Sequence, residues 1–210
     1  MITIYYYCLN MTADDERFVA GALKELAHHL NEEQIKLPIS IKRLGDEPEL
    51  IKEVDAILNR LNEQSYTFSN CAGFVQYPFF KDGIFEEGVP PKLLVYCRPD
   101  SHIARAALRE KPSAKRGANC GSFSAAYPPK DQLKSKFTIW HEAVHLLLLR
   151  DDDKDECYEP YPTYAKKGDC DCDTCIMQYE PNEKWDGKCS LCSKIIGFLR
   201  DLSKNCRESK

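Results

Sequence analysis

Residues 137–149 read FTIWHEAVHLLLL and contain an H-E-x-x-H motif formed by His141, Glu142 and His145. On a helix, side chains four residues apart lie on the same face, one turn above each other. His141 and His145 are therefore predicted to direct imidazole nitrogens at one metal ion. Glu142 is rotated by about 100°, so its carboxylate reaches a metal-bound water rather than the metal. Two surface or core histidines are the alternative, but two of only five histidines at this spacing favour a metal site.

Such a site is suited to hydrolysis. Zinc lowers the pKa of a bound water to about 7, and the glutamate takes its proton as the water attacks a carbonyl. A catalytic zinc usually has three protein ligands and one open position. If the helix ran on through Asp151, that residue would lie roughly 9 Å along the axis from His145 and about 240° around it. The chain must therefore leave the helix before it supplies a third ligand.

Two C-x-x-C pairs follow, Cys172 with Cys175 and Cys189 with Cys192, and thirteen residues separate them. This spacing is typical of a closed, four-cysteine structural zinc site. Such a site would stabilise residues 151–188, which show little hydrophobic periodicity, in place of an apolar core. Disulfides are the alternative. The sequence thus predicts two zinc ions, one catalytic and one structural.

Together, the H-E-x-x-H motif, Cys175-Ile176-Met177 and the final C-x-x-C resemble the metzincin metalloproteases, most closely the archaemetzincins. The resemblance implies a zincin fold with an active-site helix, Met177 in a tight turn beneath the catalytic zinc, and Asp151 as third ligand. The chain departs from the family pattern at three places. Leu148 replaces the turn glycine, Asp151 replaces the third histidine, and about twenty extra residues shift the first cysteine to Cys172, Cys170 or Cys157.

The missing turn glycine leaves the third ligand open. A left-handed backbone at Leu148 would cost roughly 1–2 kcal/mol. Either Leu148 accepts this strain, or the turn falls among later aspartates, which tolerate that conformation better. The alternative ligands are then Asp152, Asp153 and Asp155, and, for another zincin class, Glu156, Glu159 and Glu180.

The composition indicates one 210-residue domain, with a sheet and active-site helix in residues 1–150 and a cysteine-rich part in residues 151–210. The net charge of −4 gives no reason to expect nucleic-acid or membrane binding, and we expect a monomer. The first nine residues lack the basic region of a signal peptide, which predicts a cytoplasmic protein, or a secreted one if a leader was removed. The count of eleven cysteines is odd and excludes complete internal pairing. Four of them, in strand-like segments, are expected to be small buried hydrophobic residues: Cys8, Cys71, Cys97 and Cys120.

Hydrophobic periodicity predicts an α/β fold with helices on a sheet, and the resemblance implies a twisted mixed sheet that carries the active-site helix. We expect strands at residues 1–9, 35–44, 92–97 and 121–127, and a strand or hairpin at 66–77. We expect helices at 12–33, 49–61, 131–149 and 190–202. The basic run 99–117 is interpreted as a solvated loop or helix face, and residues 121–127 as an edge strand. The resemblance implies that an extended substrate pairs with this strand.

Three functions follow. The first is a zinc peptidase in which Glu142 is the general base and then passes the proton to the leaving amine. The second is an inactive zinc-binding domain that recognises peptides, although the retained Glu142 argues against it. The third is a secreted, disulfide-bonded protease like the reprolysins, which also have Cys-Ile-Met after the motif.

Overall fold

The computed structural model describes residues 2–32, 35–75, 78–79, 92–130, 135–148, 176–177, 191 and 193–208. They contain a five-stranded mixed sheet with the order β2-β1-β3-β5-β4. Strands β1, β2, β3 and β5 run parallel, and β4 pairs antiparallel with β5 at one edge. The predicted α/β class with a mixed sheet is therefore confirmed. The strands are β1 (Ile2–Cys8), β2 (Ile39–Arg43), β3 (Lys92–Tyr96), β4 (Gly117–Cys120) and β5 (Phe123–Ala126).

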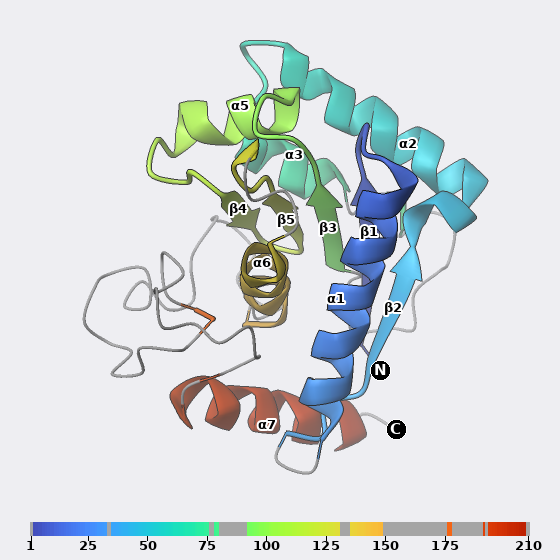
Figure 1. Cartoon of the computed structure of the whole chain (residues 1–210), viewed down its shortest axis with the longest axis vertical. Helices are drawn as coiled ribbons and strands as arrows, with labels where there is room; N and C mark the ends of the chain where they lie inside the picture. The colour runs from blue at the N-terminus through green and yellow to red at the C-terminus, as the bar shows by residue number, and fades with distance from the viewer. Residues whose placement is uncertain are drawn as a thin grey trace.

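Helices cover both faces of the sheet (Figure 1). One core contains α1 (Ala13–Asn31), α6 (Lys136–Leu148) and α7 (Ser193–Glu208). The other contains α2 (Pro48–Asn59), α3 (Phe68–Val75) and α5 (His102–Glu110), with the short 3-10 helices η1 (Leu44–Asp46) and η2 (Arg60–Asn62).

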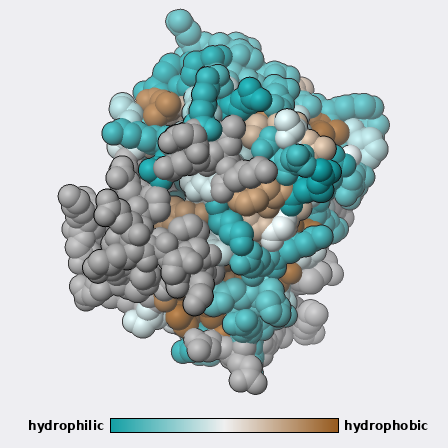
Figure 2. Space-filling view, in the orientation of Figure 1, coloured by the Kyte–Doolittle hydropathy of each residue, from teal (hydrophilic) through white to brown (hydrophobic). Residues whose placement is uncertain are grey.

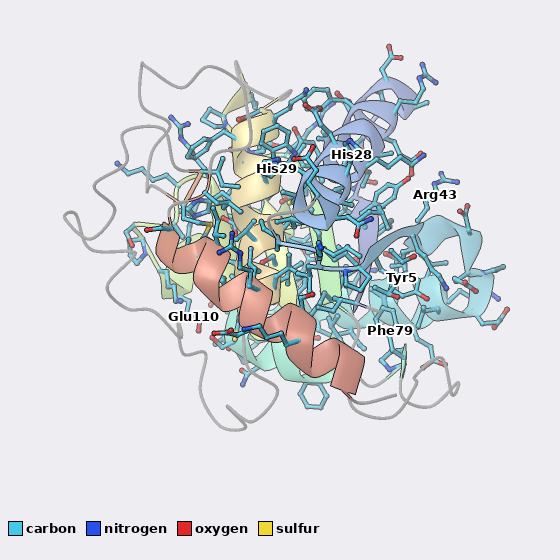
Figure 3. The ribbon with its side chains drawn as sticks, turned by 90° about the horizontal axis from the view of Figure 1, so that it is seen from below. Tyr5, His28, His29, Arg43, Phe79 and Glu110 are labelled. Carbon is cyan, nitrogen blue, oxygen red and sulfur yellow. The ribbon has the colours of Figure 1, made fainter. Side chains whose placement is uncertain are left out.

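Alternation along the strands produces the two cores. Ile4 and Tyr6 of β1 face the core of α1 and α6, whereas Tyr5 faces the opposite core. Figure 3 labels Tyr5 beside Phe79, and their ring centroids are 5.1 Å apart. Buried side chains on both faces explain why β1 and β3 are nearly continuous apolar runs in the sequence.

The prediction of a strand or hairpin at residues 66–77 is wrong, because this segment contains helix α3. The Thr67 side-chain oxygen accepts a hydrogen bond from the Asn70 backbone N–H at 3.0 Å and caps the helix. Phe68, Cys71 and Val75 are buried at helical spacing. Their contacts in the core that contains α2 and α5 outweigh the strand propensity of the aromatic residues.

In the segment 99–127, the basic run agrees with one of its two interpretations, a solvated helix face, whereas residues 121–127 differ from expectation. The basic run contains helix α5, capped by Ser101, and ends in strand β4. Strand β5 lies inside the sheet between β3 and β4, so residues 121–127 do not form its edge. Among the described strands, β4 is the outermost on this side of the sheet.

The surface offers few apolar side chains. Phe74, at 51% exposure, is the large hydrophobic residue that stands out among those described, and the face seen in Figure 2 is mainly hydrophilic. Within the described ranges, no helix has the length and apolar character needed to span a membrane.

Candidate metal centre

Helix α6 carries the H-E-x-x-H motif and is fixed on two sides. The indole Nε1 of Trp140 donates a hydrogen bond to the Ala22 carbonyl of α1 at 2.7 Å. The Ser124 hydroxyl of β5 donates to the Glu142 carbonyl at 3.1 Å, and Asn119 of β4 donates to that hydroxyl at 2.7 Å. The backbone of Glu142 is thus hydrogen-bonded directly to β5 and connected to β4 through the Ser124 hydroxyl.

The two motif histidines converge as the helical spacing predicts. Nε2 of His145 lies 3.0 Å from Nε2 of His141. Nδ1 of His141 donates to the Ile176 carbonyl at 2.7 Å, because a carbonyl only accepts. The neutral ring of His141 therefore has its lone pair on Nε2, facing His145. Two nitrogens bound to one tetrahedral zinc lie roughly 3.3 Å apart, so this donor pair fits the metal.

Both imidazoles are suited to metal binding because they are uncharged at neutral pH. Burial lowers the pKa of His141, and the hydrogen bond to Ile176 opposes this shift only in part. Burial also lowers the pKa of His145 well below its usual value, with further contributions from His141 and Lys111. A metal ligand must be the neutral ring, so little proton competition is expected at pH 7.

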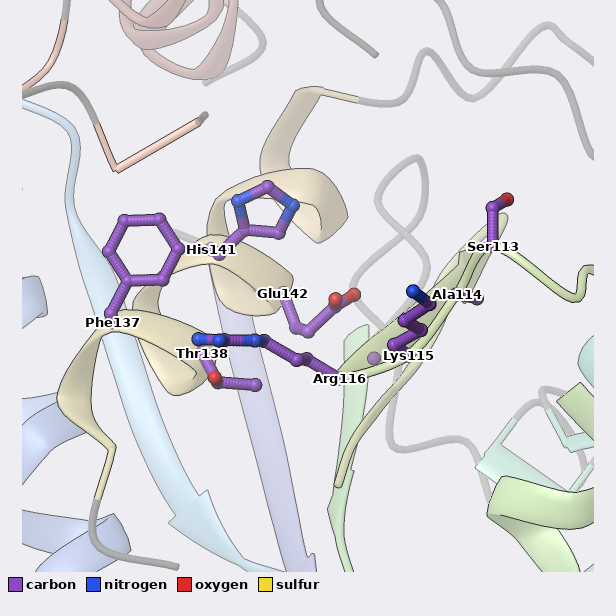
Figure 4. A pocket seen from close by; sticks show the side chains of 9 residues that line it. Ser113, Ala114, Lys115, Arg116, Phe137, Thr138, His141 and Glu142 are labelled. Atoms are coloured by element: carbon purple, nitrogen blue, oxygen red, sulfur yellow. The ribbon is translucent and has the colours of Figure 1, made fainter. Parts of the chain in front are cut away.

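Glu142 lines a small cleft that is open to solvent. Its side chain is buried at 5% exposure, and the carboxylate points towards the loop that carries Ala114 and Lys115 (Figure 4). Gly117 of β4 lies directly against it: a Cβ at this position would come within 2.5 Å of Glu142 Cδ and 2.7 Å of Cγ. Because glycine has no side chain, the Glu142 carboxylate can occupy the space that a Cβ at position 117 would fill.

The wall opposite α6 is formed by residues 113–117. Tyr127 fixes this loop through two bonds, from its N–H to the Arg116 carbonyl and from its hydroxyl to the Ala114 carbonyl, both at 2.7 Å. Lys115 and Arg116 thus line the site, and Arg116, whose Nη1 is buried, is an exception to the interpretation of the basic run as solvated. Sequence reasoning missed Arg116 and Gly117, since only the pairing of β4 with β5 brings them to Glu142.

The third ligand predicted for the catalytic zinc, Asp151, lies outside the described residues. Leu148 is the last described residue of α6 and is buried at 2% exposure. Positive φ occurs in the described part of the chain at Asn10, Lys36 and Gly121. Leu148 is therefore ordinary helix, and a left-handed turn at this residue is excluded.

The four predicted ligands of the structural zinc also lie outside the described ranges: Cys172, Cys175, Cys189 and Cys192. Across those ranges, no group of three or more His, Cys, Asp or Glu side chains is arranged to hold a metal. His141 and His145 are a pair, and completing a site requires a ligand from elsewhere.

Ile176 and Met177 form a turn that packs against α6. Both side chains are buried, at 0% and 2% exposure, in the core that contains α6. The Ile176 carbonyl fixes the tautomer of His141, a role that outer partners of metal-bound histidines commonly have. The turn next to Met177 therefore supports the site through its backbone.

The remaining cysteines of the described chain differ in state. Cys8, Cys71 and Cys97 are free, and burial raises the pKa of each thiol to about 12. Cys120 is buried in the core at 6% exposure, as expected, and is disulfide-bonded, whereas Cys8 is only partly buried.

Comparisons with models of known protein families, with curated proteins and with solved structures each gave no match.

Proposed function

We propose that this protein is a zinc-dependent peptidase that hydrolyses peptide bonds in the cleft beside α6. The observation that carries the proposal is the facing pair of Nε2 atoms of His141 and His145, 3.0 Å apart, with the carboxylate of Glu142 on the adjacent cleft. A purely structural metal site needs no buried carboxylate beside its ligands. An open cleft leaves room for a substrate, as a catalytic site requires.

Each motif residue has a separate role. His141 and His145 hold the ion through Nε2, and the Ile176 carbonyl keeps the His141 ring in the required tautomer. Zinc, when bound, would polarise the scissile carbonyl and lower the pKa of water. Glu142 accepts a proton from the attacking water at its carboxylate and then delivers it to the leaving amine.

The finer features of the proposal rest on the resemblance to the metzincins. It implies that Asp151 would complete the catalytic site, that Met177 belongs to the turn next to it, and that Cys172, Cys175, Cys189 and Cys192 would hold a second zinc. The buried turn at Ile176 and Met177, hydrogen-bonded to His141, supports this arrangement. The substrate is then a peptide or protein.

The test combines metal content and hydrolysis of a mixed peptide library. Glu142→Gln is expected to retain zinc and lose hydrolysis by at least about a hundredfold, since general bases contribute roughly 10²–10⁴. His141→Ala should lose the catalytic zinc. Glu49→Gln is the matched control, because that exposed carboxylate on α2 pairs only with Lys52 among the described groups.

Two results would contradict the proposal. Loss of zinc from Glu142→Gln would make the glutamate a ligand rather than a base. Unchanged hydrolysis in His141→Ala, with its zinc gone, would place the activity elsewhere.

A further inference from the structure

One wall of the cleft is positively charged. Its lining residues are Ser113, Ala114, Lys115, Arg116 and Gly117 from the loop and β4, and Phe137, Thr138, His141 and Glu142 from α6. Lys115 and Arg116 supply two cations, and Glu142 is the carboxylate of this lining. The cleft therefore combines the reacting groups on α6 with a cationic wall opposite them.

Arg116 is the more informative of the two cations. Its Nη1 atom is buried and has no hydrogen-bond partner. Among the carboxylates of the described chain, Glu142 included, none forms an ion pair with it. Figure 4 shows its side chain extending from the start of β4 towards Thr138 on α6. A buried donor without a partner is costly, and a ligand that supplies an acceptor there removes this cost.

The position of Arg116 is set before any ligand binds. Its carbonyl accepts from the Tyr127 N–H, and the Tyr127 side chain is fully buried and holds Ala114 of the same loop. The loop is closed further by the hydrogen bond from the Ala114 N–H to the Lys111 carbonyl at 2.9 Å. A guanidinium on a fixed backbone loses less entropy when it binds, which favours affinity.

We propose that Arg116 binds a carboxylate of the peptide, so the preferred substrates carry an acidic group near the bond that is cut. The guanidinium fork matches a carboxylate in shape and charge, and Lys115 adds a second, solvated charge at the rim. The acceptor is either an aspartate or glutamate side chain or the carboxyl terminus of the peptide. This inference rests on the proposed peptidase function, whose site it shares.

The test measures binding in the Glu142→Gln protein, which does not turn substrate over. The probe is a fluorescein-labelled alanine-based peptide with one aspartate, compared with the same peptide carrying asparagine, each with a free or an amidated C-terminus. Fluorescence anisotropy should give about 10- to 100-fold tighter binding for the peptide that carries the recognised carboxylate. Dependence on the aspartate identifies a side chain, and dependence on the free terminus identifies the terminal carboxylate.

Variants on the protein side assign the effect to Arg116. Arg116→Gln should remove the preference, and Arg116→Lys, which keeps the charge but not the fork, should retain part of it. Arg17→Gln removes an exposed charge, 73% accessible on α1, and should leave the preference unchanged. Equal binding of all peptides, or equal losses in Arg17→Gln and Arg116→Gln, would overturn the inference.

Cleavage by the wild-type protein separates the two proposals. Cleavage without any preference for an acidic peptide rejects the carboxylate site and leaves the peptidase. Selective binding of acidic peptides without cleavage keeps the carboxylate site and rejects the peptidase. The peptide comparison needs no change at Arg116. It therefore shows whether a carboxylate is recognised even if an Arg116 variant does not fold.

Discussion

The contact between Gly117 and Glu142 predicts that Gly117→Ala is destabilising and impairs hydrolysis. The added Cβ would lie 2.5 Å from Glu142 Cδ and 2.7 Å from Cγ. Carbon atoms pack best at about 3.5–4.0 Å, so one partner must move by about 1 Å. The backbone of Glu142 is held by Ser124, and that of Gly117 by its pairing with Ala126.

The size of the effect follows from these constraints. Overpacking a fixed site costs about 1–3 kcal/mol, and replacing glycine returns about 0.4–1 kcal/mol by restricting the unfolded chain. A net loss of about 1–2 kcal/mol lowers Tm by about 2–8 °C in a domain of this size. A shift of the Glu142 carboxylate by about 1 Å also lowers kcat by up to about a hundredfold.

The assay is thermal unfolding followed by circular dichroism, in a double-mutant cycle with Glu142→Ala. Removing the glutamate side chain removes the clash, so Gly117→Ala should cost little in that background. Gly21→Ala is the matched control, because nothing lies within 4 Å of its Cβ and alanine favours helix α1. An equal cost of Gly117→Ala with and without the Glu142 side chain would refute the steric argument.

Three further predictions concern the surroundings of the site. Leu148→Gly should destabilise by about 3–6 kcal/mol in urea unfolding, because it removes a buried side chain from a helix; a tolerated change would instead indicate a left-handed turn there. Tyr127→Phe should cost about 0.5–1.5 kcal/mol by the same measurement, through loss of its bond to Ala114, and a neutral result would show that this bond does not hold the loop. Burial raises the pKa of the Cys71 and Cys97 thiols to about 12, so both should resist iodoacetamide at pH 8 until the protein is unfolded. Mass spectrometry would detect the labelling, and rapid labelling of the native protein would contradict their burial.

Local sequence determined the features whose interactions are local. The H-E-x-x-H spacing alone places His141 and His145 on one helix face, because the periodicity of a helix does not depend on its surroundings. Thr12 and Asp15, three residues apart, likewise form a capping box at the start of α1. The segment 66–77 was misjudged because its aromatic residues suggested a strand, although Thr67 and Asn70 already provided a cap signal for α3.

Tertiary structure alone decided what surrounds the motif. The sequence does not show that β4 pairs antiparallel outside β5, since strand pairing depends on contacts between segments distant in the chain. That pairing brings Gly117 against Glu142 and Arg116 into the same cleft, and Tyr127 then fixes the loop between them. The sequence by itself thus provided the facing pair of histidines and the neighbouring glutamate, whereas the shape and charge of the cleft around them arise only when strand β4 is in place.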